Sequence, residues 1–283
     1  MNYSNGIKAD VHLTLVQHNT SYYLDYDQEI VEKLNQPMVY VKVSHPIGWE
    51  RIYPIFQQNA MIYDDYSTYM KMHGCACCSL TSILAAMRRS KSRFMPQDTI
   101  VEAEKNLLPR WEYDKNYDRP VEKQMPVTLY GICQILQKEA ISCKYVASFQ
   151  RKEAMEILDR HLRSGNPVIF ELSRIRYKGN IPVSINDRKY AGSYHTMIML
   201  GYDKEGKVII TDSAQREWAG SWQRLKRADL SDLMNYMFPQ KNTESTPCYF
   251  HKRKNTGGFL LVHVWDRIEN IIQKKIGNSS ALP

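Results

Sequence analysis

The chain of 283 residues lacks most of the features that mark specialised protein classes. No stretch approaches the ~18 consecutive apolar residues that a membrane-spanning helix needs. Six cysteines are too few for a disulfide-stabilised scaffold, and 13 glycines with 12 prolines exclude a collagenous or low-complexity chain. These absences leave a folded protein without a membrane span, long enough to bury a sizeable core in one large domain or two smaller ones.

Long runs of a single charge are also missing. The net charge is +8, and the basic residues stand in short groups that carry no recognisable nucleic-acid-binding motif. We expect these groups to lie on solvated faces, with a weak long-range attraction for acidic partners, and we expect no nucleic-acid partner. The groups are Arg88, Arg89, Lys91 and Arg93; Arg174, Arg176 and Lys178; Arg224, Lys226 and Arg227; and Lys252, Arg253 and Lys254.

The first residues do not have the charged and then apolar pattern of a secretory signal. Three cysteines, Cys75, Cys77 and Cys78, lie too close together in the sequence to bridge one another without strain. Both observations favour a cytoplasmic protein. A mature secreted chain whose signal has been removed is the alternative.

Changes of pattern along the chain predict three regions. Residues 1–50 form a β-rich extension, with strands at 11–16 and 38–43 and a short helix at 27–34. Residues 51–240 alternate helices with strands and form the main domain. Residues 241–283 supply a last strand and an amphipathic helix that packs on this domain.

The main domain is expected to contain several amphipathic helices and short strands. The helices are predicted from the spacing of apolar residues and from proline and glycine at their ends. They cover residues 77–89, 96–108, 126–139, 151–163 and 230–238, with a long loop over 111–124. The strands cover 143–146, 168–172, 194–202 and 207–213, and the last strand of the chain covers 258–265.

Cys75 is the first candidate for chemistry. It stands just before the predicted start of a helix, where unpaired backbone N–H groups and the positive end of the helix dipole lower a thiol pKa. Gly74, Ala76 and Ser79 around it are small, so a substrate carbonyl can approach closely. A simply buried cysteine is the alternative interpretation.

The hairpin over residues 194–213 supplies a second candidate. If Tyr202 pairs with Lys207 across the turn, His195 lies opposite Ala214 and Asp212 is its diagonal neighbour on the same face. A histidine oriented by a carboxylate can take the proton from a thiol, which nucleophilic acyl transfer requires. A buried histidine with a satisfied hydrogen bond is the alternative.

These segments together resemble the bacteriocin-processing (double-glycine leader) cysteine peptidases and their free-standing relatives. The motif at residues 74–80 resembles the family's nucleophile motif, and residues 194–213 resemble its histidine and aspartate hairpin. Residues 54–59 are similar to the segment that holds the oxyanion glutamine, and residues 164–169 to the Gly-x-Pro strand. The likeness covers roughly residues 52–238. Ala76, Cys77 and Ser213 depart from the family pattern, which bears on the substrate subclass more than on the chemistry.

The resemblance implies an α+β, papain-like fold, in which a helical part with the nucleophile packs on an antiparallel sheet with the base. It implies a cysteine peptidase that cleaves a peptide or amide bond through a thioester on Cys75. His195 would be the base and acid, and Asp212 its orienting residue. Gln58 would donate to the oxyanion together with the backbone N–H of Cys75. Gln57 remains the competitor for the glutamine role and Cys78 for the nucleophile.

Three other functions stay open. The thioester can be resolved by an amine, in an acyltransferase or peptide ligase, or the site can be an inactive module that binds peptides. A metal site is the third, because Cys248 and His251 have ligand-like spacing and can combine with His73 and the cysteines near it. The favoured interpretation needs no cofactor or metal and takes a peptide or protein substrate. Residues 1–50 are expected to cover the cleft as a regulatory segment.

Overall fold

A computed structural model describes most of the chain. The described residues are 11–26, 38–58, 67–87, 95–96, 127–173, 183–185, 188–190, 194–214, 225–239 and 257–265. The first half contains β1 (Val11–His18), β2 (Ser21–Tyr26), β3 (Met38–Ser44), β4 (Glu50–Phe56), α2 (Ser67–Met87), α4 (Leu129–Lys138) and β5 (Cys143–Val146). The second half contains α5 (Arg151–Arg163), β6 (Val168–Ser173), β7 (Val183–Ile185), β8 (Arg188–Tyr190), β9 (Tyr194–Tyr202), β10 (Val208–Thr211), β11 (Leu225–Ala228), α6 (Leu230–Met234) and β12 (Phe259–Val262).

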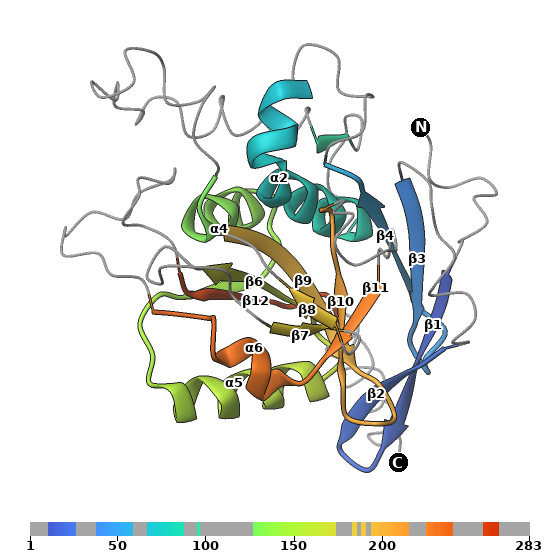
Figure 1. The fold of residues 1–283 in the computed structure, drawn as a ribbon. Coiled ribbons are helices and arrows are strands. Elements are labelled where there is room, and N and C mark those ends of the chain that lie inside the picture. The colour runs from blue at the N-terminus through green and yellow to red at the C-terminus, as the bar shows by residue number, and fades with distance from the viewer. Residues whose placement is uncertain are drawn as a thin grey trace.

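Two large sheets organise the fold (Figure 1). A four-stranded sheet has the order β2-β1-β3-β4, in which β1 and β3 are parallel. A six-stranded sheet has the order β11-β10-β9-β6-β12-β5, and every pairing within it is antiparallel. Strands β7 and β8 form a separate hairpin. The antiparallel central sheet with helices against it is the α+β arrangement that the sequence predicts.

The six-stranded sheet separates two hydrophobic cores. One face packs against α2, α4 and the four-stranded sheet, and the other packs against α5 and α6. Strand β6 shows the division, because Ile169 belongs to the first core while Phe170 and Leu172 belong to the second. This alternation follows from the period of two in a strand and leaves both faces of the central strands buried.

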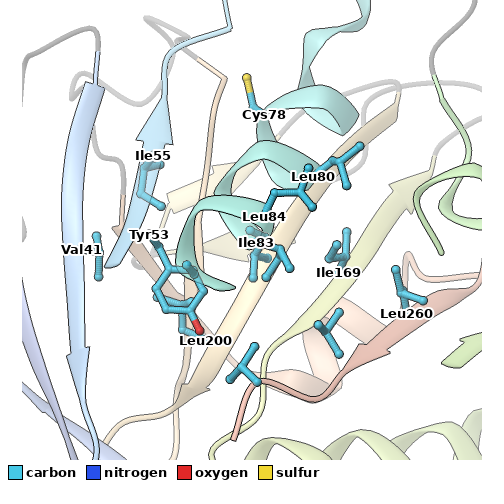
Figure 2. Packing of buried hydrophobic residues seen from close by; sticks show 14 of the residues in the cluster. Val41, Tyr53, Ile55, Cys78, Leu80, Ile83, Leu84, Ile169, Leu200 and Leu260 are labelled. Carbon is cyan, nitrogen blue, oxygen red and sulfur yellow. The ribbon is translucent and has the colours of Figure 1, made fainter. Parts of the chain in front are cut away.

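Helix α2 is the centre of the first core (Figure 2). Its Leu80, Ile83 and Leu84 lie between the small sheet, represented by Tyr53, and the large sheet, represented by Leu200. All five side chains are at most 3% exposed. Because full burial of a Leu or Ile side chain is worth about 1.5–3 kcal/mol, α2 is held firmly between the two sheets.

Strands β1 to β4 share one core with α2. The expected boundary at residue 50 falls at the β3–β4 hairpin, where Ser44 pairs with Glu50. At the other edge of the sheet, Leu24 in β2 bridges to Asp203 in the turn after β9. The division of the chain into three regions stays a prediction, but the described strands on either side of residue 50 pack as one unit. The proposed role of residues 1–50 as a cover over the cleft also stays a prediction.

Most predicted elements are present with shifted ends. The helix expected at 126–139 is α4, whose N-cap Thr128 accepts a hydrogen bond from the Gly131 N–H at 3.0 Å. The helix at 151–163 and the strand at 143–146 have the predicted bounds. The helix expected at 230–238 is shorter and ends at Met234. The expected elements at 27–34, 96–108 and 111–124, and the amphipathic helix expected after the last strand, lie outside the described residues except for Pro96.

Within the described part of the chain, no helix is both long enough and sufficiently apolar to cross a membrane.

Candidate active site

Cys75 lies inside helix α2 and not in front of it. The sequence predicts a helix from residue 77, whereas α2 begins at Ser67, so the predicted helix start is wrong. The apolar and small residues that precede Cys75 continue the helix through Gly74, although glycine in a helix interior costs about 0.5–1 kcal/mol relative to alanine. The dipole argument for an acidic thiol therefore does not apply, because it holds only within the first turn.

Gly74 allows the end of strand β4 to approach the helix. A Cβ atom at this position would lie 2.6 Å from Cε of Met70 and 3.2 Å from Cβ of Gln58. The absence of a side chain at Gly74 therefore brings Gln58, two residues after β4, next to the turn of α2 that holds Cys75. A larger residue here would displace the flexible end of Met70 and press on Gln58, so glycine keeps this approach close.

The His195 imidazole interacts with the Cys75 thiol, and this interaction shifts the pKa of both groups. The two side chains come from α2 and from the start of β9, and both residues are at most 3% exposed. Burial alone raises the pKa of Cys75, but the hydrogen bond and charge of His195 and hydrogen bonds from Thr196 outweigh it and lower the pKa. The imidazole, and not the helix dipole, makes this thiol acidic.

Asp212 follows strand β10 and holds the other side of the imidazole. Nε2–H of His195 donates to Oδ1 of Asp212 at 2.6 Å, so Nδ1 is the ring nitrogen left for the thiol. Burial lowers the pKa of His195, but the Asp212 carboxylate and Cys75 outweigh it and raise the pKa to about 9. The imidazole is therefore protonated at neutral pH. The predicted contact between His195 and Asp212 is confirmed.

Lys226 binds the second oxygen of the same carboxylate. Its Nζ donates to Oδ2 of Asp212 from strand β11, while the backbone N–H of Ala214 donates to Oδ1 at 2.7 Å. Burial raises the pKa of Asp212, but the charges of Lys226 and His195 outweigh it and hold the pKa well below its usual range. The carboxylate is thus ionised although Asp212 is fully buried.

The side chain of Gln58 is oriented by the residue after Asp212. The Ser213 hydroxyl donates to Oε1 of Gln58 at 3.1 Å, and the Gln58 backbone N–H donates to the Ser213 carbonyl at 2.9 Å. Nε2 of Gln58 then donates to the carbonyl oxygen of Lys71 at 3.3 Å. In an α-helix the N–H of residue 75 is directed at the same carbonyl. Two donors near the thiol therefore converge on one carbonyl oxygen.

The competing residues of the sequence analysis lie elsewhere. Cys78 is one turn further along α2 and belongs to the buried hydrophobic core, as does Cys77 (Figure 2). Gln57 is buried, and the side chain that accepts from the Ser213 hydroxyl and donates to the Lys71 carbonyl is that of Gln58. For the metal alternative, Cys248 and His251 lie outside the described residues. Among the described side chains, no three His, Cys, Asp or Glu residues are grouped closely enough to hold a metal ion.

Two side chains at the site were missed by sequence reasoning. Lys226 belongs to a basic group that was expected on a solvated face, an expectation that the structure contradicts, because its side chain is 11% exposed. The cause is the short strand β11, which the sequence analysis did not predict. Ser213 was noted only as a departure from the family pattern. The position of Ser213 next to the candidate aspartate was the sequence signal that could have indicated its place in the site.

The antiparallel sheet that carries His195, packed against a helix that carries Cys75, defines a protein of the papain-like cysteine peptidase fold class. The model of the peptidase C39-like family matches residues 51–241, about two thirds of the chain. The chain belongs to this family. The expected family relationship and fold class are confirmed.

One solved structure shows a distant similarity to this chain. A solved structure described as the crystal structure of UfSP from C. elegans is similar, with 16% sequence identity and a TM-score of 0.34. The similarity covers 75% of this chain and 32% of that one, so the chain spans about a third of the length of that structure. No protein with a curated description matches the chain.

Proposed function

We propose that this protein is a thiol hydrolase that cleaves a peptide or amide bond through a thioester on Cys75. The single observation that carries the proposal is the His195–Asp212 hydrogen bond, on an imidazole that also interacts with the Cys75 thiol. A nucleophile, a base and a group that orients the base are the three parts that covalent acyl transfer needs. All three are buried.

The resting state is a thiolate beside an imidazolium. The pKa of Cys75 is lowered and that of His195 is raised to about 9, each by the other. Both shifts favour the state in which the proton lies on the imidazole and the sulfur is the thiolate nucleophile. Asp212 keeps the ring in the orientation that directs Nδ1 to the sulfur.

The reaction proceeds in two steps. In the first, the sulfur attacks the carbonyl carbon, a C–S bond forms, and the C–N bond breaks as Nδ1–H of His195 gives its proton to the leaving amine. In the second, neutral His195 takes a proton from water as the water oxygen attacks the thioester. The C–S bond then breaks, which releases the acid and restores the thiolate–imidazolium pair.

The negative charge on the substrate oxygen needs donors during both steps. Gln58 is the side-chain donor in this proposal, because its Nε2 is held beside the helix turn of Cys75. Its present acceptor is a carbonyl oxygen, that of Lys71. The substrate carbonyl takes the place of this acceptor, so binding requires Gln58 to exchange one carbonyl for another.

The experiment is cleavage of a complex peptide mixture by the full chain, with the new termini identified by mass spectrometry. We expect defined new termini for the unchanged protein and a loss of about 10⁶-fold in rate for Cys75→Ala, because the nucleophile acts as a unit with its base. Gln58→Ala should lower kcat by about 10²–10³-fold, the usual effect of one oxyanion donor.

Three outcomes of the same assay would contradict the proposal. Cleavage that survives in Cys75→Ala assigns the chemistry to another residue. Products joined to added amines, in place of free acids, identify an acyltransferase that uses the same site. A protein that neither cleaves peptides nor forms a covalent adduct with an electrophilic peptide at Cys75 is a binding module.

A further inference from the structure

Lys226 is an unusual residue to find beside this site. Lysine is almost never buried unless it is paired, and the side chain of Lys226 is 11% exposed against 0% for Asp212. Strand β11 pairs Lys226 directly with Ile210 of β10, and Asp212 lies two residues beyond Ile210. Because side chains alternate along a strand, Lys226 and Asp212 belong to the same face of the sheet. The position of this lysine is thus set by the register of the sheet.

With Lys226 included, the site is a row of four groups whose charges alternate. The Cys75 thiolate is negative, the His195 imidazolium positive, the Asp212 carboxylate negative and the Lys226 ammonium positive. Each group contacts the next, and the four charges cancel. Without the lysine, the same buried row has a net charge of −1. A buried net charge is costly, and a site in that state gains a proton to remove it.

We propose that Lys226 is a positioning residue whose positive charge allows the Cys75 thiolate, the His195 imidazolium and the Asp212 carboxylate to be charged together in a buried site. The proposal deepens the proposed function and rests on it. Lys226 does not touch the reacting atoms. It acts through Asp212, by holding Oδ2 and by balancing the charge of the row.

Other charged groups near this row have different partners. Strand β6, which also flanks β9, places Leu172 opposite His195. Its Glu171 pairs with Thr196 on the other face, where its carboxylate accepts a hydrogen bond from the Gly257 N–H. On β11, Arg227 points away from Lys226 and binds Asp203. Among the described residues, Lys226 is therefore the lysine that joins the His195 imidazolium on the Asp212 carboxylate.

The consequence is a defined change in proton affinity. When Lys226 is replaced by a neutral residue, the remaining three groups of the row bind protons more strongly. The thiolate then forms only at higher pH, and the imidazolium loses its proton only at higher pH. Lys226 is two interactions away from the imidazole and three from the thiol. A unit charge at such a separation, at the effective dielectric constant of a protein site, corresponds to a shift of roughly one pH unit. In a plot of activity against pH, both the rise that follows thiolate formation and the fall that follows loss of the imidazolium proton should therefore move to higher pH.

The test measures the thiolate directly and needs no substrate. The probe is iodoacetamide, and the readout is the rate of alkylation of Cys75 in the full chain as a function of pH, followed by mass spectrometry of the peptide that contains it. Lys226→Met removes the charge, Lys226→Gln keeps a donor for Asp212 without the charge, and Lys226→Arg keeps both. Lys207→Met is the matched control, because Lys207 forms an exposed ion pair with Asp229 at 2.7 Å, away from the site.

We expect the inflection for Cys75 to rise by about one pH unit in Lys226→Met and Lys226→Gln, and to stay at the unchanged protein's pH in Lys226→Arg and Lys207→Met. An unshifted inflection in Lys226→Gln overturns the proposal, and this variant decides the question if Lys226→Met does not fold. Failure of the proposed function looks different. In that case the unchanged protein itself titrates like an ordinary thiol, near pH ~8.5.

Discussion

The β9–β10 hairpin has an aspartate at each end, and each aspartate binds a cation from strand β11. At one end Asp212 binds Lys226, and at the other Asp203 binds Arg227 through Nε at 2.6 Å. Lys226 and Arg227 are consecutive, so their side chains leave β11 in opposite directions. An aspartate paired with a basic side chain of β11 thus occurs twice in one hairpin. The two ends differ in the third partner, that is, in the group that the aspartate binds in addition to its cation.

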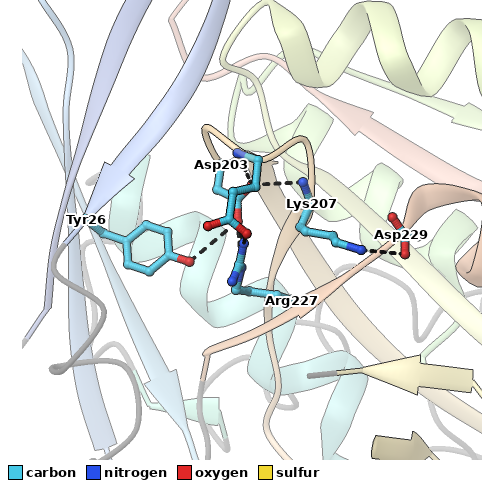
Figure 3. A network of polar contacts seen from close by, with 6 residues as sticks. Tyr26, Asp203, Lys207, Arg227 and Asp229 are labelled. Carbon is cyan, nitrogen blue, oxygen red and sulfur yellow. Dashed lines mark hydrogen bonds and ion pairs between the residues drawn. The ribbon is translucent and has the colours of Figure 1, made fainter. Parts of the chain in front are cut away.

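At the Asp203 end the third partners belong to the scaffold (Figure 3). Oδ1 of Asp203 accepts the backbone N–H groups of Glu205 and Lys207 at 2.9 and 2.8 Å, which fixes the turn. Oδ2 accepts the Tyr26 hydroxyl at 3.5 Å, which links the turn to the four-stranded sheet. Burial, as the largest cause, raises the pKa of Tyr26 to about 12, so the hydroxyl keeps its proton at physiological pH.

At the Asp212 end the third partner is an imidazole that titrates and is itself bonded to a thiol. The comparison indicates that a buried carboxylate with a cation is not by itself a sign of catalysis. It becomes one when its other oxygen holds a group that can give up and regain a proton during a reaction. The two ends can therefore be separated by experiment, since one should control activity and the other stability.

The largest expected difference is between Asp212→Asn and Asp203→Asn. We expect Asp212→Asn to lower kcat/KM by about 10²–10⁴-fold, because the imidazole loses the carboxylate that orients it and raises its pKa. Asp203→Asn should leave kcat/KM close to that of the unchanged protein and lower the free energy of unfolding by about 2–3 kcal/mol, since it breaks a largely buried ion pair.

Both quantities can be measured for both variants, with the cleaved peptide as substrate and urea unfolding for stability. Each variant serves as the control for the other, because both exchange a buried carboxylate in the same hairpin for an amide. An equal loss of activity in the two variants would show that the hairpin acts as one structural unit and that the comparison is wrong.

The site was predicted from the sequence through two errors that compensate. The predicted pairing of Tyr202 with Lys207 is wrong by one residue, because Tyr202 pairs with Val208. A β-bulge between Ile209 and Ile210 then shifts the register, so that Thr211 pairs with Ile198 as the original prediction requires. His195 and Asp212 consequently meet. Bulges add one residue to one strand, here Leu200 of β9. The glycine next to it, Gly201 with a φ of 153°, was the available sequence signal, because an isolated glycine inside a strand often marks a bulge.

Other parts of the site were outside the reach of local patterns. Strand β11 is four residues long with no alternation of apolar and polar side chains, so Lys226 and Arg227 read as a solvated basic group. The start of α2 was misplaced because glycine at position 74 normally favours a helix end. It is tolerated in the helix interior because Gln58 and Met70 occupy the space beside it. Both features are set by tertiary contacts.

The pH dependence of activity offers the next largest effect. The pKa of His195 is about 9, raised from the ordinary value of 6.5. The imidazolium therefore persists as pH rises until about 9, and above that pH we expect kcat/KM to fall about tenfold per unit, as the proton for the leaving amine is lost. The folding contribution has the same sign, because stability from a raised histidine pKa is present below 6.5 and is lost as pH rises through 9.

Titration and unfolding can be told apart with one control. The protein is held at each pH and then assayed at neutral pH, where activity lost by reversible titration returns. The Asp203 end should stay intact in this range, since the pKa of Tyr26 is about 12. A decline in kcat/KM that begins near pH 6.5 would show that Asp212 does not raise the pKa of His195.

The smallest effect on stability is expected for Tyr26, which binds Asp203 from the four-stranded sheet. Tyr26→Phe removes a hydroxyl whose hydrogen bond to Asp203 is long, at 3.5 Å, and half-buried. We expect urea unfolding to show a loss of about 0.5 kcal/mol or less, with kcat/KM unchanged. The same substitution made in the Asp203→Asn background should cost still less, because the acceptor is altered. A loss of activity in Tyr26→Phe without a loss of stability would mean that the four-stranded sheet is coupled to the catalytic end through this contact, and the two ends of the hairpin would no longer count as independent.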